Sequence, residues 1–214
     1  FLRPPEDFAE RGARERRRWV DFLGFNPRAI LLFAGRWSSE KRIKLLMDVV
    51  PVGCALVIVG DSDTLYADEI ENSRRQNVLP LRRMLNAEEL RVAYAASDLF
   101  VSASDFETLG NVVMEAWASD LPAAVQPAGG HLEFVKDGYN SYFVDFDDPG
   151  AARLKLEAIV DAAASGADSS LRAGLREEGA RLRRQDFATA VRQALLDPAL
   201  AAKEVWKSRW FLEP

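Results

Sequence analysis

Short apolar runs recur along the chain, and a segment with helical periodicity follows each of them. Runs of this length, bounded by glycine, proline or charged residues, are typical of strands buried on both faces of a sheet. Strands that alternate with helices predict an α/β fold, a Rossmann-like, doubly wound parallel sheet of about six strands with a helical C-terminal extension. The predicted strands are 29–34, 54–60, 78–81, 99–102, 122–125 and 141–145.

Helices are expected between these strands and at both ends of the chain. The pattern predicts three parts: a linker helix region at 1–27, the sheet domain at 28–165, and C-terminal helices at 166–214 that pack on this domain or on a surface outside it. Within 28–214 the predicted helices are 40–50 with Ser38 or Ser39 as its cap, 64–75, 88–93 capped by Asn86, one that begins at Thr108, one through 133–135, 150–164, and 171–196.

Composition narrows the function classes. Hydrophobic residues make up 48% of the chain and charged residues 29%, which is ordinary for a globular protein. A net charge of -5 argues against a nucleic-acid partner bound by a broad positive field. The single cysteine, Cys54, excludes an internal disulfide and is expected to be buried in a strand. Neither a signal peptide nor a run of about 18 apolar residues is present, so no spanning segment is expected.

The polar segment after the fourth predicted strand carries the first candidate site. A strand, a turn and a helix start follow one another there, and a helix N-terminus favours an anion, so phosphate is expected over Thr108, Leu109 and Gly110. Glu107 and Glu115 are eight residues apart, about 12 Å along a helix, and could reach the two ends of an elongated ligand. The alternative is that Glu107 is a solvated first-turn charge and that Glu115 forms a salt bridge.

Two further turns supply candidate ligand contacts, one through charged side chains and the other through the backbone. Gly35 ends the first predicted strand, and Arg36 and Lys41 flank the turn, where they could bind phosphate oxygens as a planar fork and as a point charge. The alternative is a solvated helix start. After the fifth predicted strand, Gly129 and Gly130 let the backbone approach a ligand closely.

Several other polar residues have more than one interpretation. Asp61, Ser62 and Asp63 form a D-x-D after a strand, which is typical of a metal site in some enzymes but also of an ordinary turn. His131, the only histidine, is read as a turn residue. Arg82 and Arg83 could cover a nucleotide or phosphate, or be a solvated pair. Acidic residues at 145–148 suit a helix cap better than calcium.

Taken together, these motifs resemble a known family. Residues 107–119 read Glu-Thr-Leu-Gly-Asn-Val-Val-Met-Glu-Ala-Trp-Ala-Ser, and Pro122, Gly129 and Gly130 follow. This wording is similar to the donor-site segment of the group 1 retaining glycosyltransferases of the GT-B fold. Within that family it looks most like the sulfolipid synthase branch, which transfers sulfoquinovose to diacylglycerol. The resemblance covers about residues 28–148.

The resemblance implies a role for each matched residue. Gly35, Arg36 and Lys41 correspond to the turn that clamps the donor diphosphate. Glu115 would bind the ribose hydroxyls. Glu107 would be the catalytic residue, contacting hydroxyls of the transferred sugar and stabilising positive charge at the anomeric carbon.

The remaining matches concern backbone. Gly129 and Gly130 would lie near the phosphates and the sugar. Gly60 and Asp61 match a glycine-rich turn of the family, so neither a metal nor any other cofactor is expected. Arg83 stands where the family has glycine, in the loop that frames the nucleobase.

The implied function is the donor-binding half of a glycosyltransferase. The expected partners are a nucleotide-diphosphate sugar, first of all a UDP-sugar, an acceptor that is a lipid or a glycan, and an N-terminal GT-B domain absent from this chain. Without that domain we expect no sugar transfer by this chain. The resemblance also implies a role of the whole enzyme in glycolipid biosynthesis. The competing hypothesis, motivated by Arg83 and the absent half, is a non-catalytic nucleotide-sugar-binding or regulatory module.

The two ends of the chain bear on location. The basic cluster at Arg14, Arg16, Arg17 and Arg18 could contact anionic lipid, although a solvated linker helix is the preferred interpretation. An apolar stripe that includes Trp206 and Trp210 is expected to dock on the missing domain or, second, on a membrane surface. The expected location is cytoplasmic or at an organellar membrane such as that of a plastid, and not secreted.

Overall fold

The structure is a computed structural model that describes residues 8–184 apart from 63, 74 and 109. It contains one six-stranded parallel sheet with the strand order β3-β2-β1-β4-β5-β6. This confirms the predicted fold class. The strands are β1 (Ile30–Ala34), β2 (Ala55–Gly60), β3 (Val78–Arg82), β4 (Leu99–Ser102), β5 (Ala123–Val125) and β6 (Tyr142–Phe143).

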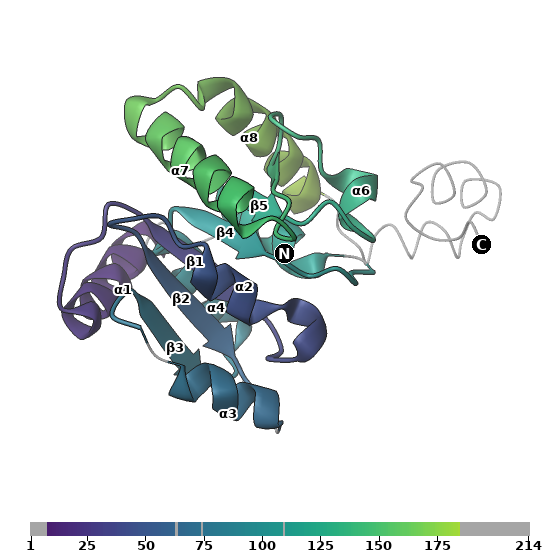
Figure 1. Cartoon of the computed structure of the whole chain (residues 1–214). Coiled ribbons are helices and arrows are strands. Elements are labelled where there is room, and N and C mark those ends of the chain that lie inside the picture. The colour runs from purple at the N-terminus through teal and green to yellow at the C-terminus, as the bar shows by residue number, and fades with distance from the viewer. Residues whose placement is uncertain (1–7, 63, 74, 109, 185–214) are drawn as a thin grey trace, which may run out of the picture.

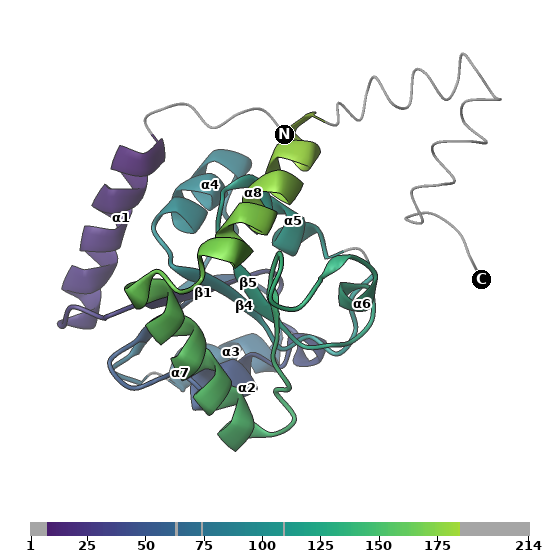
Figure 2. The ribbon, with the colours of Figure 1, turned by 90° about the horizontal axis from the view of Figure 1, so that it is seen from above.

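Helices cover both faces of the sheet, which Figure 2 shows lying between two helical layers. One layer is formed by α2, α3 and α7, and the other by α1, α4, α5 and α8 (Figure 1). The helices are α1 (Phe8–Leu23), the 3-10 turn η1 (Ser39–Lys41), α2 (Ile43–Asp48), α3 (Leu65–Asn72), α4 (Ala87–Ala95), α5 (Asn111–Ala118), α6 (His131–Phe134), α7 (Pro149–Ser165) and α8 (Ser169–Arg184).

Strand β1 explains why the apolar runs are continuous rather than alternating. Leu31 and Phe33 enter the hydrophobic cluster on the α2 side, whereas Ile30, Leu32 and Ala34 enter the cluster on the α4 side. Every residue of β1 and β2 is buried, since helices cover both faces of a parallel sheet. Such a strand can place functional groups only beyond its ends.

Two of the predicted caps, Asn86 and the acidic residue before α7, cap their helices, whereas Ser38 makes no side-chain cap hydrogen bond. The Asn86 side chain accepts hydrogen bonds from the N–H groups of Glu88 and Glu89, and the Glu89 carboxylate accepts from the Asn86 N–H, which completes a capping box. Thr64 caps α3 and Asp148 caps α7 through their side-chain oxygens. The acidic residue at the start of α7 is therefore a helix cap, as the sequence indicated.

Two helix predictions were wrong in detail. The helix expected at 40–50 is divided into η1 and α2, because Arg42 between them adopts a left-handed backbone with φ 51°. The helix expected from Thr108 begins at Asn111 instead. Gly110 precedes it with φ 57°, and a β-carbon there would lie 2.3 Å from the Phe134 ring, so close packing delays the helix.

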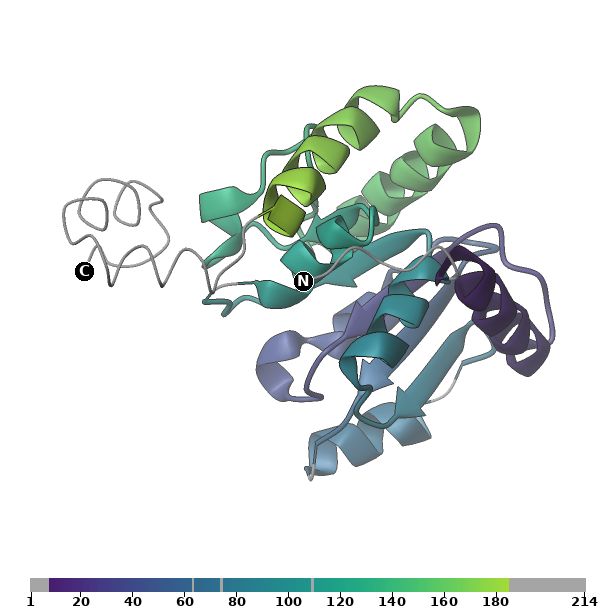
Figure 3. The same cartoon turned by 180° about the vertical axis from the view of Figure 1, so that it is seen from behind.

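The N-terminal helix is not the solvated linker that its charges favoured. Phe8, Trp19 and Leu23 are buried, and α1 lies along α4 (Figure 3). The Arg16 guanidinium donates to the Asp98 carboxylate at 2.7 Å. One face of α1 is thus part of the domain surface, while Arg14 and Arg17 on the other face are exposed.

At the other end, α8 packs against α5. The rest of the predicted helix at 171–196 and the stripe with Trp206 and Trp210 lie outside the described residues. In the part of the chain that the structure describes, no helix combines the length and apolar character needed to cross a bilayer.

Candidate functional site

The candidate site lies where the strand order reverses, between β1 and β4. β2 and β3 extend to one side of β1, and β5 and β6 extend beyond β4 on the other. Loops that leave the carboxyl ends of β1 and β4 diverge at such a point, and open α/β sheets bind ligands in the resulting crevice. The predicted residues at 35–41, 107, 108, 110, 129 and 130 follow the carboxyl ends of β1, β4 and β5 at this edge.

Lys41 and Glu107 form the centre of the site. The Lys41 Nζ lies 2.8 Å from Glu107 Oε2, although the residues are 66 positions apart in the sequence. Their side chains are 19% and 15% exposed, so the pair is largely shielded from water. The Lys41 ammonium also lies 3.5 Å from the Ser104 hydroxyl. Glu107 is therefore paired across the crevice, not a solvated first-turn charge.

The two glycines of the fifth-strand loop support the Glu107 backbone. The Gly130 N–H donates to the Glu107 carbonyl at 2.6 Å. A β-carbon on Gly130 would lie 2.2 Å from the Thr108 carbonyl oxygen, and one on Gly129, where φ is +53°, would lie 2.6 Å from the Glu107 carbonyl oxygen. Only glycine fits at these positions, which explains the Gly-Gly pair by packing between two loops.

Arg36 lies on the rim and does not contact the Lys41–Glu107 pair in this structure. Its side chain is 70% exposed and lies 3.3 Å from the Glu40 carboxylate. The Ser38 hydroxyl donates to the same carboxylate at 2.6 Å, and this hydrogen bond is the main cause of the lowered pKa of Glu40. Gly35 opens the turn with φ 156°. The Arg36 guanidinium is thus held near the crevice by an exposed ion pair that a ligand could replace.

Glu115 has a different environment from the salt bridge that was its alternative interpretation. The Tyr94 hydroxyl, itself buried, donates to Glu115 Oε2 at 3.1 Å. Burial raises the pKa of Glu115, while the Tyr94 hydrogen bond and the charge of Arg91 oppose that rise. Among the described residues, the hydrogen-bond partner of this carboxylate is a neutral hydroxyl, and its charge remains available to a ligand.

The anion position over Thr108, Leu109 and Gly110 stays a prediction. Leu109 lies outside the described residues, and Gly110 is the residue immediately before α5. The first turn of α5 nevertheless points its N–H groups toward this edge, as any helix that follows a strand of a parallel sheet does.

A polar network beneath the site was not foreseen. Gln126 is buried after β5; its side-chain Nε2 donates to Asp147 at 3.0 Å and its Oε1 accepts from the Phe146 N–H at 2.7 Å. Arg42, which follows Lys41, donates to the same Asp147. This network ties the residue next to Lys41 to the ends of β5 and β6. A lone glutamine after a strand carries no sequence signal for such a role.

His131 is buried and neutral in character. Its Nδ1 lies 3.0 Å from the Gln126 carbonyl oxygen, and the carbonyl can only accept, so Nδ1 carries the proton. Nε2 is buried and has no hydrogen-bond partner among the described residues. Burial lowers the pKa of His131. The histidine therefore belongs to the packing behind the Gly110 turn and not to an exposed turn.

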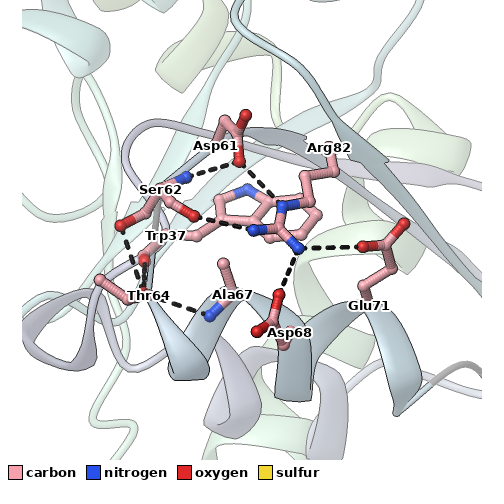
Figure 4. Close-up of polar contacts among 8 residues, drawn as sticks. All are labelled: Trp37, Asp61, Ser62, Thr64, Ala67, Asp68, Glu71 and Arg82. Carbon is pink, nitrogen blue, oxygen red and sulfur yellow. Dashed lines mark hydrogen bonds and ion pairs between the residues drawn. The ribbon is translucent and has the colours of Figure 1, made fainter.

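The D-x-D segment is organised by an arginine (Figure 4). The Arg82 side chain donates to Asp61 at 2.9 Å, to Asp68 at 2.5 Å, to Glu71 at 3.1 Å and to the Ser62 carbonyl at 3.0 Å. The guanidinium holds the turn after β2 and the helix α3 against the end of β3. Within the described residues, no group of three or more acidic, cysteine or histidine side chains could hold a metal ion.

Arg82 is therefore neither a solvated residue nor a nucleotide cover in this structure. Its neighbour Arg83 pairs with Glu89 on the surface at 2.8 Å, with the arginine side chain 56% exposed. Asp63 lies outside the described residues.

Comparison with known proteins identifies the family. The sequence model described as "Glycosyl transferases group 1" matches residues 28–162, well over half of the chain. The chain belongs to the group 1 glycosyltransferases. The matched range covers the sheet, and Lys41, Glu107 and Glu115 lie within it.

Curated relatives of this glycosyltransferase chain include two bacterial proteins and one plant protein that show the range of their names. A lipopolysaccharide core biosynthesis glycosyltransferase, LpsE of Rhizobium meliloti, is 35% identical over 70% of this chain and 43% of the relative. A GDP-mannose-dependent alpha-mannosyltransferase of Corynebacterium glutamicum is 34% identical over 60% and 32%. The sulfoquinovosyl transferase SQD2 of Arabidopsis thaliana is 33% identical over 58% and 28%. The chain thus spans less than half the length of these relatives.

Solved structures show the same fold. HepE of Anabaena, in complex with UDP and glucose, superposes with a TM-score of 0.65 at 20% identity, over 85% of this chain and 52% of that one. The C-terminal domain of LpcC, a group 1 family protein of Francisella tularensis, superposes with a TM-score of 0.63 at 20% identity, over 87% and 95%. The described domain therefore has the architecture of one half of a GT-B fold.

Proposed function

We propose that this chain is the donor-binding half of a retaining glycosyltransferase, which takes a sugar from a nucleotide-diphosphate sugar. The observation that supports this most directly is the Lys41–Glu107 pair, whose atoms lie 2.8 Å apart at the strand reversal. A largely buried ion pair contributes little net stability, because desolvation of both charges offsets their attraction. The position of the pair in the crevice is explained if a ligand supplies one polar contact to Lys41 and another to Glu107.

The donor phosphates would take the cationic side of the pair. Lys41 would contact a diphosphate oxygen, and Arg36 would leave its exposed contact with Glu40 to bind a second one. The N–H groups at the start of α5 and the close backbone at Gly129 and Gly130 would face the same phosphates. The leaving nucleotide would depart as an anion stabilised by these groups.

The two glutamates would bind hydroxyls at opposite ends of the donor. Glu107, released from Lys41 when the ammonium turns to the diphosphate, would accept hydrogen bonds from the transferred sugar. Its carboxylate would also stabilise positive charge that develops at the anomeric carbon. Glu115, on α5 and in contact with Tyr94 of α4, would accept hydrogen bonds from the ribose hydroxyls.

In this proposal a second domain, outside this chain, binds the acceptor. Four exposed apolar side chains, Leu65, Met84, Phe106 and Leu132, stand after the carboxyl ends of β2, β3, β4 and β5. An apolar rim around a ligand-binding edge suits a second domain that closes over the donor. We propose a lipid or glycan acceptor, and no activity until that domain is present.

The donor base is proposed to be uracil. HepE of Anabaena is described with UDP-glucose, whereas three relatives are named as GDP-mannose-dependent, so the neighbours differ on this point. Donor binding is proposed to need no metal, since Arg82 occupies the carboxylates of Asp61, Asp68 and Glu71.

Calorimetric titration of the purified chain with UDP, GDP, ADP and UDP-glucose tests the proposal. We expect one nucleotide to bind selectively, to bind equally well with a chelator present, and to lose affinity in Lys41→Met and Glu115→Ala variants. Lys44→Met is the matched control, because Lys44 pairs with Glu69 on the surface away from the crevice. Absence of binding by the folded chain, or equal loss in the control, would contradict the assignment.

The second candidate function is a non-catalytic nucleotide-sugar-binding module, favoured by Arg83 in the loop where the family has glycine. The two candidates differ once an acceptor-binding half is supplied. A hybrid that joins this whole chain to the acceptor half of a relative should transfer sugar under the first proposal. Under the second, the hybrid should bind the donor without transferring sugar. Transfer that is restored by Arg83→Gly would identify Arg83 as the cause of the inactivity.

A further inference from the structure

Tyr94 and Glu115 form a buried contact between α4 and α5 that the family comparison does not assign. The Tyr94 side chain is 2% exposed, and its hydroxyl lies 3.1 Å from Glu115 Oε2 and 3.3 Å from the Val112 carbonyl oxygen. Both acceptors belong to α5, one turn apart. The hydroxyl carries a single proton, which a carboxylate binds more strongly than a peptide carbonyl does.

The contact has two physical consequences for Glu115. A glutamate side chain has several staggered rotamers, and a hydrogen bond to Oε2 from a fixed ring selects one of them. The same bond partly compensates a carboxylate that burial disfavours, and the charge of Arg91 acts in the same direction. The second oxygen, Oε1, is left for a ligand hydroxyl.

We propose that Tyr94 is a positioning residue for Glu115: its buried hydroxyl fixes the carboxylate so that the second oxygen accepts the ribose hydroxyls of the donor nucleotide. This inference rests on the proposed function, in which Glu115 binds ribose. Tyr94 itself does not touch the ligand, because it is enclosed between α4, α5 and the sheet.

Packing and positioning by Tyr94 can be separated. Its ring meets Phe100 edge to face, with centroids 6.2 Å apart, and the ring of phenylalanine would keep that contact. Tyr94→Phe therefore removes the hydroxyl and leaves the hydrophobic core filled. Tyr66→Phe is the matched control, because the Tyr66 hydroxyl accepts a hydrogen bond from the Lys44 N–H on α2, outside the crevice.

The test compares UDP with 2′,3′-dideoxy-UDP by calorimetry of the full chain; the corresponding GDP pair is used if GDP binds more tightly. The wild-type chain should prefer the ribonucleotide. Tyr94→Phe should weaken UDP binding about ten-fold, the loss of one hydrogen bond to a charged group, and leave the dideoxy affinity unchanged. The control variant should bind both as the wild type does.

A pH profile gives a readout that a purely structural role would not move. The Tyr94 hydrogen bond holds the pKa of Glu115 down against burial, and Arg91 is the other charge that acts on it. Without the hydroxyl the pKa of Glu115 should rise, so the acid-side loss of UDP affinity should move to higher pH. In a Glu115→Gln background, Tyr94→Phe should change neither affinity nor profile.

The possible failures are distinguishable. If the wild-type chain binds no nucleotide, or binds UDP and its dideoxy analogue equally, the proposed role of Glu115 fails and the inference fails with it. If the wild type prefers UDP, and Tyr94→Phe retains that preference and the same pH profile, the inference alone is overturned. An equal weakening toward both nucleotides would show that Tyr94 acts through packing, which also overturns it.

Discussion

The Lys41 ammonium and the Glu107 carboxylate meet at 2.8 Å, and in doing so they join the loop after β1 to the loop after β4. These two loops begin at neighbouring strands whose connections run in opposite directions along the sheet. The ion pair therefore spans the crevice that the topology creates, and a ligand that enters it must separate the two charges or bind both. Neither partner is free to act as an ordinary surface charge.

Replacement of Lys41 by methionine should lower both stability and affinity. Glu107 would remain 15% exposed without its cation, and we expect a cost of about 2 kcal/mol, less than for a fully buried pair. In the double variant Lys41→Met/Glu107→Gln, most of that stability should return because no lone charge is left, while nucleotide binding should not. Urea unfolding and calorimetry measure the two effects, and a double variant as unstable as the single one would contradict this account.

Gly130→Ala should be strongly destabilising although its backbone is not left-handed. The new β-carbon would lie 2.2 Å from the Thr108 carbonyl oxygen, so the loop that holds Glu107 must move, at about 3 kcal/mol. Gly138→Ala is the control: φ is +74° but nothing lies within 4 Å, and backbone strain alone should cost about 1 kcal/mol. Equal melting temperatures for the two variants would argue against contact between the loops.

Stability should fall in mild acid because of His131. Burial lowers its pKa in the folded state below the ordinary 6.5, so the unfolded chain takes up a proton before the folded chain does. The contribution of His131 to the free energy of unfolding is therefore fully present above about pH 6.5, and it decreases as the pH falls toward the pKa of the folded state. Unfolding at a series of pH values should show a shallower slope in His131→Leu, and identical slopes would refute the prediction.

Arg82→Met should loosen the turn after β2 without affecting the centre of the site. Three carboxylates would lose their shared guanidinium, and the pKa of Asp61, which the Arg82 hydrogen bond lowers most, should return toward its ordinary value. The melting temperature should fall at low salt, and the difference from wild type should shrink in high salt, which screens exposed pairs. Manganese should not restore stability; restoration would indicate a metal site at Asp61.

Much of the fold could be predicted from the sequence for a local reason. Short apolar runs such as Leu99–Ser102, bounded by polar residues, favour strands covered on both sides. Asn86 with Glu89 three positions later is a complete capping box within one short segment. These signals depend on residues that are neighbours in the chain, so they survive without knowledge of what packs on them. The resemblance to the family rested on residues 107–119 and the Gly129–Gly130 pair, which are likewise short segments of the chain.

The details of the site depended on contacts between distant segments. Gly110 delays α5 because Phe134, from α6, occupies the space that a side chain would need. The hydrogen-bond partner of Glu115 is Tyr94. Arg82 contacts three carboxylates, one from the turn after β2 and two from α3. The sequence by itself determined which residues lie at the carboxyl edge of the sheet. Only the tertiary structure decided which of them are paired, buried or exposed, because electrostatic pairing and close packing act between atoms that the chain order does not bring together.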